Sequence, residues 1–499
     1  MDRTFADTAL LLLPIAAPLL AAAVYAVAGW RRATAHLGTA AAAVILASGI
    51  AVAVSVARNG PLTTLGGWLH ADALSAFLLL VIGSVATLAC AASPAYLAAE
   101  HAAHEGGSRR RYGALVSCFL AAMCLGTLAG NLGLAWIAIE ATTIVTAFLV
   151  GHHHTRAALE AAWKYTVICS VGIALALLGI VVLYDAARHA GLSEATALNP
   201  AALTAHARAL DPAVTRMATA FMVLGFGAKA GLAPLHAWLP DAHSQAPAPV
   251  SALMSGVLLA VAFTQILRVK QIADAALGPA FSRTLLLIAG LATLALAALL
   301  LLAQRDYKRM LAYSSMEHMG LIAVAAAIGT RLALAALLLH IAGHGLAKTV
   351  AFTASGHLLQ AERTTRIEQI RALATRRPAL AGILAAALLA LLGLPPFSLF
   401  ASELGIARAG FAAHLGIPVA AAFVLALVAF AALARHTASM LLGDDEPPAA
   451  GEPPKAAATT RLSLAARAPL ITGLTAVAAL GVTAWPINTL LSLAAQGGR

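Results

Sequence analysis

Long apolar stretches recur from one end of the chain to the other, separated by short polar segments. A helix needs ~20 mostly apolar residues to cross a bilayer. The pattern therefore predicts an all-α polytopic membrane protein with about 14 transmembrane helices. We expect the spans at 8–28, 36–57, 72–98, 112–130, 132–151, 161–184, 212–239, 248–268, 282–304, 310–329, 331–358, 379–408, 416–440 and 468–492.

Two of the expected spans contain helix-breaking residues. The span at 212–239 includes Gly231 and Pro234, and the span at 379–408 includes Pro395 and Pro396. Proline removes a backbone donor and clashes with the preceding turn, so both helices should be discontinuous within the membrane. Interruptions at corresponding positions of two halves predict two inverted five-helix repeats. The expected regions are three N-terminal helices in 1–111, a first repeat in 112–272, a second repeat in 273–440, and a cytoplasmic loop with the last helix in 441–499.

The composition supports the same class. Hydrophobic residues make up 61% of the chain and charged residues 11%, which leaves too little polar surface to cover a water-soluble globule. The net charge of +11 comes from basic residues in short loops, so membrane topology explains it better than nucleic-acid binding. Loops after the odd-numbered spans carry more Lys and Arg, which predicts that they are cytoplasmic and that both termini lie outside. The Pro- and acid-rich segment 443–460 should be an extended cytoplasmic loop.

Several features argue against other kinds of site. Cys90, Cys118, Cys124 and Cys169 lie inside apolar spans without a CxxC pair, so neither a disulfide framework nor an iron–sulfur or zinc site is supported. No P-loop, GxSxG or HExxH motif occurs, which does not support a soluble-type catalytic centre. We therefore expect no metal and no cofactor in this chain. The histidine run at 152–154 should be a solvated cap on the fifth span, with metal binding or proton collection as the alternatives.

Ionisable residues inside the first half of the chain are the first candidates for chemistry. Lys229 lies directly before the break in the seventh span, Glu140 is the lone charge of the fifth, and Lys164 lies near the start of the sixth. A charge near the bilayer centre costs ~2.5–3.5 kcal/mol on insertion scales, so Glu140 should be neutral or paired with Lys229 or Lys164. A buried lysine can exchange a proton. A snorkelling Lys229 and a purely structural ion pair are the plainer alternatives.

The eleventh span carries His340, His344 and Lys348 at intervals of four. Each step of four drifts only ~40° around a helix, so the three side chains form one stripe. Histidine titrates near neutral pH, and a stripe of this kind can pass protons. A metal site is the competing use of such a pair, but no acidic third ligand accompanies it in the sequence.

Further ionisable residues complete the series in the second half. Glu403 follows the second break. Glu317 and His318 are weaker candidates for chemistry, because they lie near the start of the tenth span, where they could be interfacial. Ionisable residues with a purely structural role are seldom this numerous inside the hydrocarbon core of a membrane. We therefore favour a proton-conducting path.

Three stretches of the sequence are similar to a known family. Residues 229–253 (KAGLAPLHAWLPDAHSQAPAPVSAL), 306–320 (DYKRMLAYSSMEHMG) and 340–356 (HIAGHGLAKTVAFTASG) resemble the antiporter-like membrane subunits of respiratory complex I, Mrp-type cation/proton antiporters and group 4 nickel–iron hydrogenases. The resemblance covers nearly the whole chain. It looks strongest toward the F branch of the hydrogenase-4 membrane subunits.

The resemblance implies a fold of 14 helices with two inverted five-helix repeats and a chain of key charged groups. Helix eight departs from the family pattern, because Ser255 and Ala260 stand where relatives carry His or Lys. Water or His243 would then link the two half-channels, and His236 beside the first break is a secondary candidate. The residues that match the family's key positions are Glu140, Lys164, Lys229, His340, His344, Lys348 and Glu403.

By resemblance, the chain would be a proton-translocating membrane subunit of a redox-driven complex of the hydrogenase-4 or NADH–quinone oxidoreductase type. It would hold no cofactor and would assemble with other membrane subunits in a bacterial-type inner (plasma) membrane. The alternatives are a cation/proton antiporter subunit or the membrane subunit of an inorganic-carbon uptake system, both without a redox partner. A secondary transporter for an organic solute also uses broken helices, but it needs a roomy central cavity.

Overall fold

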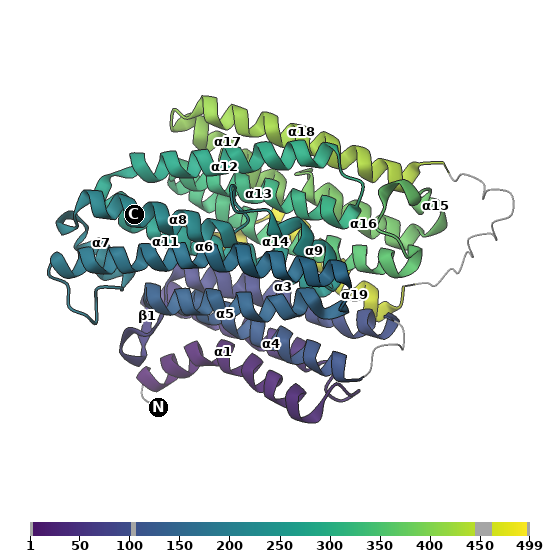
Figure 1. Cartoon of the computed structure of the whole chain (residues 1–499), viewed down its shortest axis with the longest axis horizontal. Coiled ribbons are helices and arrows are strands. Elements are labelled where there is room, and N and C mark those ends of the chain that lie inside the picture. The colour runs from purple at the N-terminus through teal and green to yellow at the C-terminus, as the bar shows by residue number, and fades with distance from the viewer. Residues whose placement is uncertain (1–2, 101–105, 445–461, 497–499) are drawn as a thin grey trace.

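The computed structural model describes residues 3–100, 106–444 and 462–496, and these residues are almost entirely helical (Figure 1). Within them, twelve helices are long and apolar enough to cross a membrane. The predicted all-α multi-pass fold is confirmed. They are α1 (Arg3–Ala28), α2 (Leu37–Asn59), α3 (Ala73–Ala99), α4 (Gly106–Leu128), α5 (Leu132–Val150), α6 (Arg156–His189), α10 to α11 (Ala248–Leu277), α12 (Pro279–Leu302), α13 (Tyr307–Ile328), α14 (Arg331–Glu362), α18 (Gly416–Leu442) and α19 (Leu464–Val482).

Shorter elements connect and interrupt these helices. A small antiparallel hairpin precedes α3, with Leu62 opposite Ala71 and Thr64 opposite Leu69. A single π-helical turn, Met254–Leu258, joins α10 to α11. The shorter elements are β1 (Leu62–Thr64), β2 (Leu69–Ala71), α7 (Pro200–Ala205), α8 (Pro212–Lys229), α9 (Trp238–Gln245), α10 (Ala248–Leu253), α11 (Leu259–Leu277), α15 (Leu373–Arg376), α16 (Pro378–Leu391), α17 (Ser398–Ala412) and α20 (Trp485–Gln496).

Local sequence signals explain where many helices begin. A short polar side chain at the N-cap accepts a hydrogen bond from a backbone amide of the first turn, which otherwise has no partner. This happens at the starts of α3, α5, α6, α8, α13 and α14. The N-cap residues are Asp72, Asn131, Thr155, Asp211, Asp306 and Thr330.

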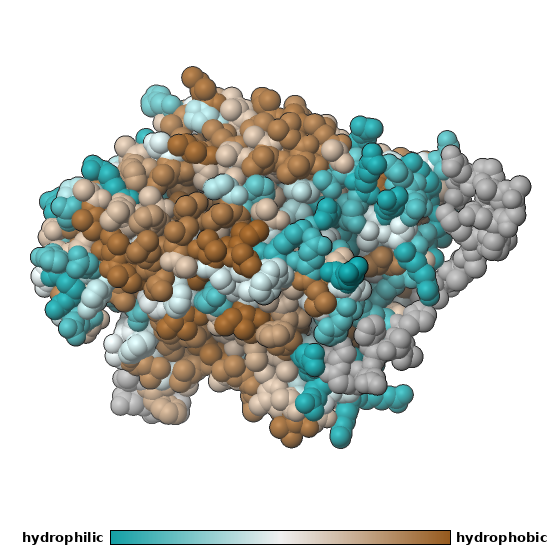
Figure 2. Space-filling model, in the orientation of Figure 1, coloured by the Kyte–Doolittle hydropathy of each residue, from teal (hydrophilic) through white to brown (hydrophobic). Residues whose placement is uncertain are grey.

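The centre of the bundle is built from α10, α11, α13 and α14, and these helices are almost fully buried. The outer helices expose large apolar residues such as Leu20, Ile417 and Leu427. Figure 2 shows hydrophobic residues over the middle of the molecule and hydrophilic residues gathered at its two ends. This distribution fits a bundle whose middle faces lipid.

Close helix contacts depend on small residues, as they do generally in membranes. A Cβ at Gly225 of α8 would lie 2.5 Å from the carbonyl oxygen of Gly172 in α6. A Cβ at Gly83 of α3 would lie 2.5 Å from the Cα of Leu46 in α2. Neither position has room for a side chain, so these glycines set how closely the helices approach.

The two predicted discontinuous helices are confirmed. α8 ends at Lys229 and α9 begins at Trp238, while α16 ends at Leu391 and α17 begins at Ser398. Each break contains a glycine at positive φ, Gly231 at +78° and Gly393 at +62°. Glycine adopts this conformation without the steric cost that a Cβ brings. The predicted count of 14 helices, the inverted repeats and the region boundaries stay predictions.

One predicted span is wrong in its continuity. The expected helix at 468–492 is two helices, α19 and α20, because Thr483 is extended with φ −148° and ψ 120°. Pro486 lies in the first turn of α20 and could not continue a helix from α19 without removing a hydrogen bond. Most of the predicted loop at 443–460 lies outside the described residues.

Candidate functional site

Buried polar side chains from several helices gather in the interior of the bundle. Seven lysine and histidine residues of the described part of the chain are at most 2% exposed, although burying such groups is costly unless they find hydrogen-bond partners. Six come from the predicted set, and Lys308 does not. They are Lys229, His243, Lys308, His318, His340, His344 and Lys348.

Lys229 ends α8 at the first break and is held by hydroxyl groups. Its Nζ donates to Thr143 Oγ1 at 2.8 Å and to the hydroxyl of Tyr165. The Nζ also lies 4.6 Å from the centroid of the Tyr165 ring, whose edge-on partner is Trp238 at 4.9 Å. Trp238 in turn donates from Nε1 to the Ala228 carbonyl at 2.8 Å, which fixes the start of α9 beside the lysine. Lys229 does not snorkel.

Glu140 and Lys164 differ from the expected pairing. Glu140 accepts a hydrogen bond from Ser170 Oγ at 3.2 Å, and its Oε2 has no hydrogen-bond partner in the described part of the chain. Among the ion pairs of the described residues, none joins Glu140 to a lysine. The Lys164 side chain is 45% exposed and pairs with Glu160 at 2.6 Å and Asp241 at 3.1 Å. The sixth span begins at Arg156, so Lys164 lies near a helix end that solvent reaches.

The segment around the first break carries three further groups. His243 is fully buried in α9, with Nδ1 bonded to the Leu239 carbonyl at 2.9 Å and Nε2 without a partner in the described part. His236 lies in the break itself, half-buried, and its Nδ1 also lacks a partner there. Lys308, which the sequence pattern assigns to a cytoplasmic loop, is only 2% exposed and donates to the Ala246 carbonyl at 2.9 Å.

Lys348 occupies the middle of α14 and repeats the arrangement around Lys229. Its Nζ donates to the Leu311 carbonyl at 2.8 Å and to Ser314 Oγ. The neighbouring Ser315 exchanges a 2.7 Å hydrogen bond with Ser255 in the π-helical turn of the eighth span. Ser255, which by the resemblance stands at a position of Lys or His, is therefore part of the polar interior through Ser315.

Three histidines continue from Lys348 toward the second break. His318 Nδ1 and His340 Nε2 lie 3.1 Å apart, and His340 Nδ1 lies 2.9 Å from Ser402 Oγ on α17. The ring of His344 lies 5.0 Å from the ring of His318. His318 is fully buried and Glu317 is 7% exposed, so both side chains point into the bundle.

Glu403 lies next to the second break and next to a cavity. A Cβ at Gly393 would lie 2.5 Å from Glu403 Oε2, so the break makes room for the carboxyl group. Glu403 and Glu317 both line a cavity of about 150 Å³ that is otherwise formed mainly by leucine and phenylalanine side chains. A cavity of this size holds several water molecules.

The same groups form a set that could hold a metal ion. One ligand atom each from His318, His340 and Glu403 lie within 4.8 Å of one another. The sequence pattern shows no acidic third ligand, but folding supplies one from α17. In the structure the two imidazoles are hydrogen-bonded to each other. That direct bond is the arrangement a proton relay needs.

The histidine run after α5 is solvated only in part, because His154 is exposed whereas His152 is buried. His152 is 6% exposed, with its ring 5.6 Å from the Tyr112 ring. His153 bonds Glu100 Oε1 through Nε2 at 2.5 Å and the Gln245 carbonyl through Nδ1 at 3.2 Å. The run therefore ties α3, α5 and α9 together at one end of the bundle.

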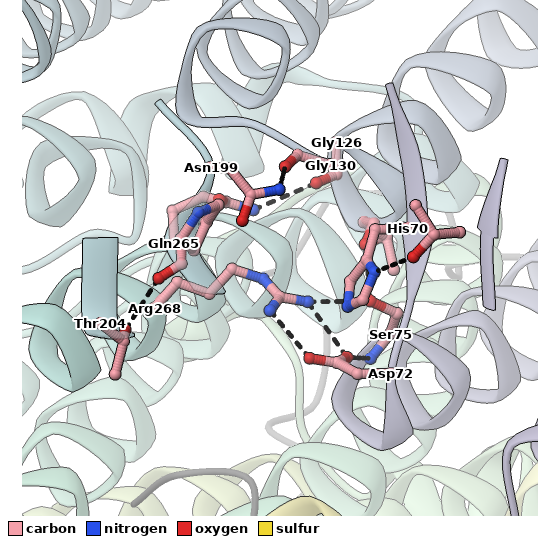
Figure 3. A network of polar contacts seen from close by, with 12 residues as sticks. His70, Asp72, Ser75, Gly126, Gly130, Asn199, Thr204, Gln265 and Arg268 are labelled. Atoms are coloured by element: carbon pink, nitrogen blue, oxygen red, sulfur yellow. Dashed lines mark hydrogen bonds and ion pairs between the residues drawn. The ribbon is translucent and has the colours of Figure 1, made fainter. Parts of the chain in front are cut away.

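A separate polar network joins the N-terminal helices to α11 near the hairpin (Figure 3). Arg268 binds both carboxylate oxygens of Asp72, at 2.9 and 3.1 Å, and Ser75 Oγ at 2.9 Å. Burial alone would raise the pKa of Asp72, but the Arg268 guanidinium and the Ser75 amide hold it well below its usual range. Burial lowers the pKa of the neighbouring His70. This network is a structural clamp and is separate from the buried lysines and histidines described above.

Sequence reasoning did not find the hydroxyl groups that complete the site. Thr143, Tyr165, Ser314 and Ser402 are ordinary residues for membrane helices, where hydroxyls often bond their own backbone. The available signal is their position on helices that carry a buried charge. Ser314 lies three residues before Glu317, and Thr143 three residues after Glu140.

The fold and this interior define a multi-pass membrane protein with a chain of buried, hydrogen-bonded ionisable groups, and comparisons with known proteins agree. A family model described as "NADH:quinone oxidoreductase/Mrp antiporter, TM" matches residues 129–429, more than half of the chain. The chain therefore belongs to this family of membrane subunits.

Two curated relatives support the assignment. The chain is 38% identical over 349 residues to a hydrogenase-4 component F homolog of Methylacidiphilum infernorum, covering 70% of this chain and 73% of the relative. It is 31% identical over 409 residues to NADH-quinone oxidoreductase subunit N of Desulforudis audaxviator, covering 78% of each.

Solved structures share the fold over nearly the full length. A chain of the Mrp complex from Dietzia superposes with a TM-score of 0.85 at 23% identity, covering 98% of this chain and 97% of that one. A chain of respiratory complex I from Thermus thermophilus gives 0.80 at 22% identity, covering 99% of each. At these identities the likeness shows the fold alone.

Proposed function

We propose that this chain translocates protons as a membrane subunit of a redox-driven complex of the hydrogenase-4 or NADH–quinone oxidoreductase type. The observation that carries the proposal is the fully buried pair His318–His340, bonded onward to Ser402 and lying beside Glu403 at a small cavity. The names of the curated relatives support the type of complex. The protein would hold no redox centre and would couple a partner's reaction to proton movement.

In the first half, Lys229 is the group that holds or releases a proton. Its partners Thr143 and Tyr165 are neutral hydroxyls, so no fixed carboxylate compensates its charge. The Oε2 of Glu140 has no hydrogen-bond partner in the described part of the chain. A change in the charge of the Glu140 carboxyl group would shift the equilibrium between charged and neutral Lys229. Glu140 acts at a distance in this scheme and needs no direct ion pair.

In the second half, a proton passes from Lys348 through the histidines to Glu403. Hydroxyl groups lie at both ends of this route, Ser314 at Lys348 and Ser402 at His340, and they can donate and accept in turn. Ser255 and Ser315 link the eighth span to the same region. His243, with a free Nε2 in the described part, is the proposed connection with the first half.

The cavity at Glu403 would be where the path meets water or a neighbouring subunit. Its volume of about 150 Å³ suits a short file of water and is too small for most organic solutes. This favours a proton path over a solute transporter. The neighbouring subunits, the inner (plasma) membrane and the outward placement of both termini belong to this proposal.

Replacing Lys229 tests the proposal. The complex that contains this chain should be isolated from its native membrane, reconstituted into vesicles with an internal pH-sensitive dye, and driven by its own electron donor. Lys229→Ala should abolish proton translocation, since alanine cannot carry a proton. Lys270→Ala is the matched control, because Lys270 is also buried, at 7% exposure, but pairs with Asp274 and is not part of the proposed proton path. Unchanged translocation in Lys229→Ala would refute the scheme.

A further inference from the structure

Two histidines and a glutamate from three different helices meet beside the second break. His318 lies on α13, His340 on α14 and Glu403 on α17, and α14 packs against both of the other helices. One ligand atom from each residue lies within 4.8 Å of the other two. Both histidines are fully buried. Imidazole nitrogens and a carboxylate oxygen are donors that zinc and related divalent ions prefer.

The two imidazoles are spaced as zinc ligands are. Zinc–nitrogen bonds of ~2.0–2.1 Å at a tetrahedral angle place two ligand nitrogens about 3.3 Å apart. His318 Nδ1 and His340 Nε2 are 3.1 Å apart, so one ion can bind both with only a small shift of the rings. The cavity beside Glu403 leaves room for its carboxyl group to approach the same ion.

The hydrogen bonds around His340 already suit a bound metal. Ser402 Oγ donates to the Leu399 carbonyl at 2.8 Å, so it accepts from His340 Nδ1 at 2.9 Å. The hydrogen of His340 is then on Nδ1, and its Nε2 presents a lone pair. Histidines that bind zinc usually donate from their second nitrogen to a partner of this kind, which fixes the ring.

His318 can adopt the matching form without losing a hydrogen. Its Nδ1 donates to His340 Nε2 in the metal-free arrangement, and its Nε2 has no hydrogen-bond partner in the described part of the chain. When a metal binds Nδ1, the hydrogen moves to Nε2, and the ring stays neutral. The ion therefore replaces the hydrogen bond between the two rings.

The charges at the site also suit a divalent cation. Glu403 and Glu317 line the same cavity of about 150 Å³, and Glu317 is only 7% exposed. Two carboxylates repel each other in a medium of low dielectric constant, whereas one divalent ion compensates both. The cavity also has space for a water molecule as a fourth ligand.

We propose that His318, His340 and Glu403 bind one Zn²⁺ ion, with a water molecule from the cavity as the fourth ligand. The ion occupies the lone pairs of His318 Nδ1 and His340 Nε2, between which a proton passes in the proposed path. Zinc therefore stops proton translocation. This block rests on the proposed function, but the coordination does not.

Zinc binding by the detergent-purified complex, without an electron donor, tests the coordination. EDTA-treated complex should be titrated with Zn²⁺ against a chromophoric chelator. His318→Gln should weaken binding at one site by about a hundredfold or more, since losing only a hydrogen-bond partner of a ligand costs ~10–100-fold. Ser402→Ala, which removes such a partner, should weaken it by about tenfold. His357→Gln is the matched control, because His357 is also buried, at 7% exposure, but lies ~25 Å along α14 from His340.

X-ray absorption at the zinc edge needs no variant and so does not depend on how a variant folds. Wild-type complex carrying the added Zn²⁺ should show two imidazole nitrogens at ~2.0–2.1 Å and oxygen ligands at similar distances. Equal zinc binding by wild type and His318→Gln, or a spectrum without imidazole, would overturn the site.

Proton uptake separates this inference from the proposed function. In vesicles that contain the reconstituted complex, Zn²⁺ should stop proton uptake and EDTA should restore it. Zinc that binds at this site and leaves proton uptake unchanged would overturn the block. A complex that binds zinc as described but moves no protons even without zinc would refute the proposed function and support the site.

Discussion

Two fully buried lysines, Lys229 and Lys348, have similar partners and different surroundings. Each donates to a side-chain hydroxyl, Thr143 for the first and Ser314 for the second. The Nζ of Lys229 also lies over the ring of Tyr165, which packs edge-on against Trp238. Lys348, in contrast, shares its helix with two histidines that lead toward Glu403.

The difference suggests a division of labour between the halves. A lysine held only by neutral groups responds strongly to a distant charge, because no fixed counter-ion masks it in a medium of low dielectric constant. A series of imidazoles offers an exchangeable position at each step. In the proposed mechanism the first half senses and holds charge, and the second half passes a proton on through its histidines.

Removing Lys348 should have the largest effect. Lys348→Ala should abolish proton translocation as completely as Lys229→Ala does, because the histidine chain would lose its donor. The measurement is dye-reported proton uptake by vesicles containing the reconstituted complex, with Lys270→Ala as the control. Translocation that survives Lys348→Ala but not Lys229→Ala would show that the two halves work independently.

Interrupting the histidine chain should have the next largest effect. His340→Gln keeps hydrogen-bonding groups near His318 and Ser402 but cannot be protonated near neutral pH. We expect translocation to fall by about a hundredfold or more, the lower end of the range for loss of a proton-transfer group. Ser402→Ala should have a smaller effect, since it removes one hydroxyl beside the same ring. The initial rate of proton uptake distinguishes these results, and a larger loss in Ser402→Ala would contradict the proposed order of groups.

Replacing Ser255 should have a modest effect. Ser255→Ala removes one hydrogen bond to Ser315, worth about 1 kcal/mol, which corresponds to roughly a fivefold change in rate. Ser255→Thr keeps the hydroxyl and should stay close to wild type. Equal rates for all three proteins would mean that the eighth span takes no part in linking the halves.

The Asp72–Arg268 clamp should affect stability and not translocation. Asp72→Asn should lower the free energy of unfolding by roughly 2–3 kcal/mol, less than for a fully buried pair because the Asp72 side chain is 28% exposed. The folded-state pKa of Asp72 is lowered, so its stabilisation is complete above the unfolded pKa of ~3.9 and is lost only as the pH falls through the folded value.

The pKa of His70 is also lowered on folding, so stability should decline somewhat as the pH falls below ~6.5, where the unfolded histidine takes up a proton. Thermal unfolding of the purified protein at pH 5 to 8 tests both statements. The decline should be smaller in His70→Gln, because the other buried histidines still contribute to it, and should be present in Asp72→Asn. A midpoint that falls steeply between pH 8 and 7 would contradict this account.

The apolar pattern predicted the fold class and both helix breaks, because spans and prolines are read directly from neighbouring residues. It failed at the last span, where Thr483 interrupts an otherwise apolar run. It also placed Lys308 in a loop, since a charge just inside a helix end looks the same as one just outside it. Tertiary packing against Ala246 decides the difference.

The candidate site was only partly accessible from the sequence. The stripe of His340, His344 and Lys348 follows from helical periodicity. Its contact with His318 and Ser402 depends on how α13 and α17 pack against α14, which no local pattern encodes. Lys164 shows the opposite error, because position in a span suggested burial while Asp241 and Glu160 hold the lysine at an exposed end.

Infrared difference spectroscopy of the reconstituted complex, comparing the resting state with turnover, tests the central claim most directly. A carboxyl band that changes during turnover in wild type and is missing in Glu403→Gln would report protonation of Glu403. We predict that Lys348→Ala, with Glu403 intact, also loses this change, because the proton reaches Glu403 through Lys348 and the histidines. A band change of normal size in Lys348→Ala would contradict a continuous route between these groups.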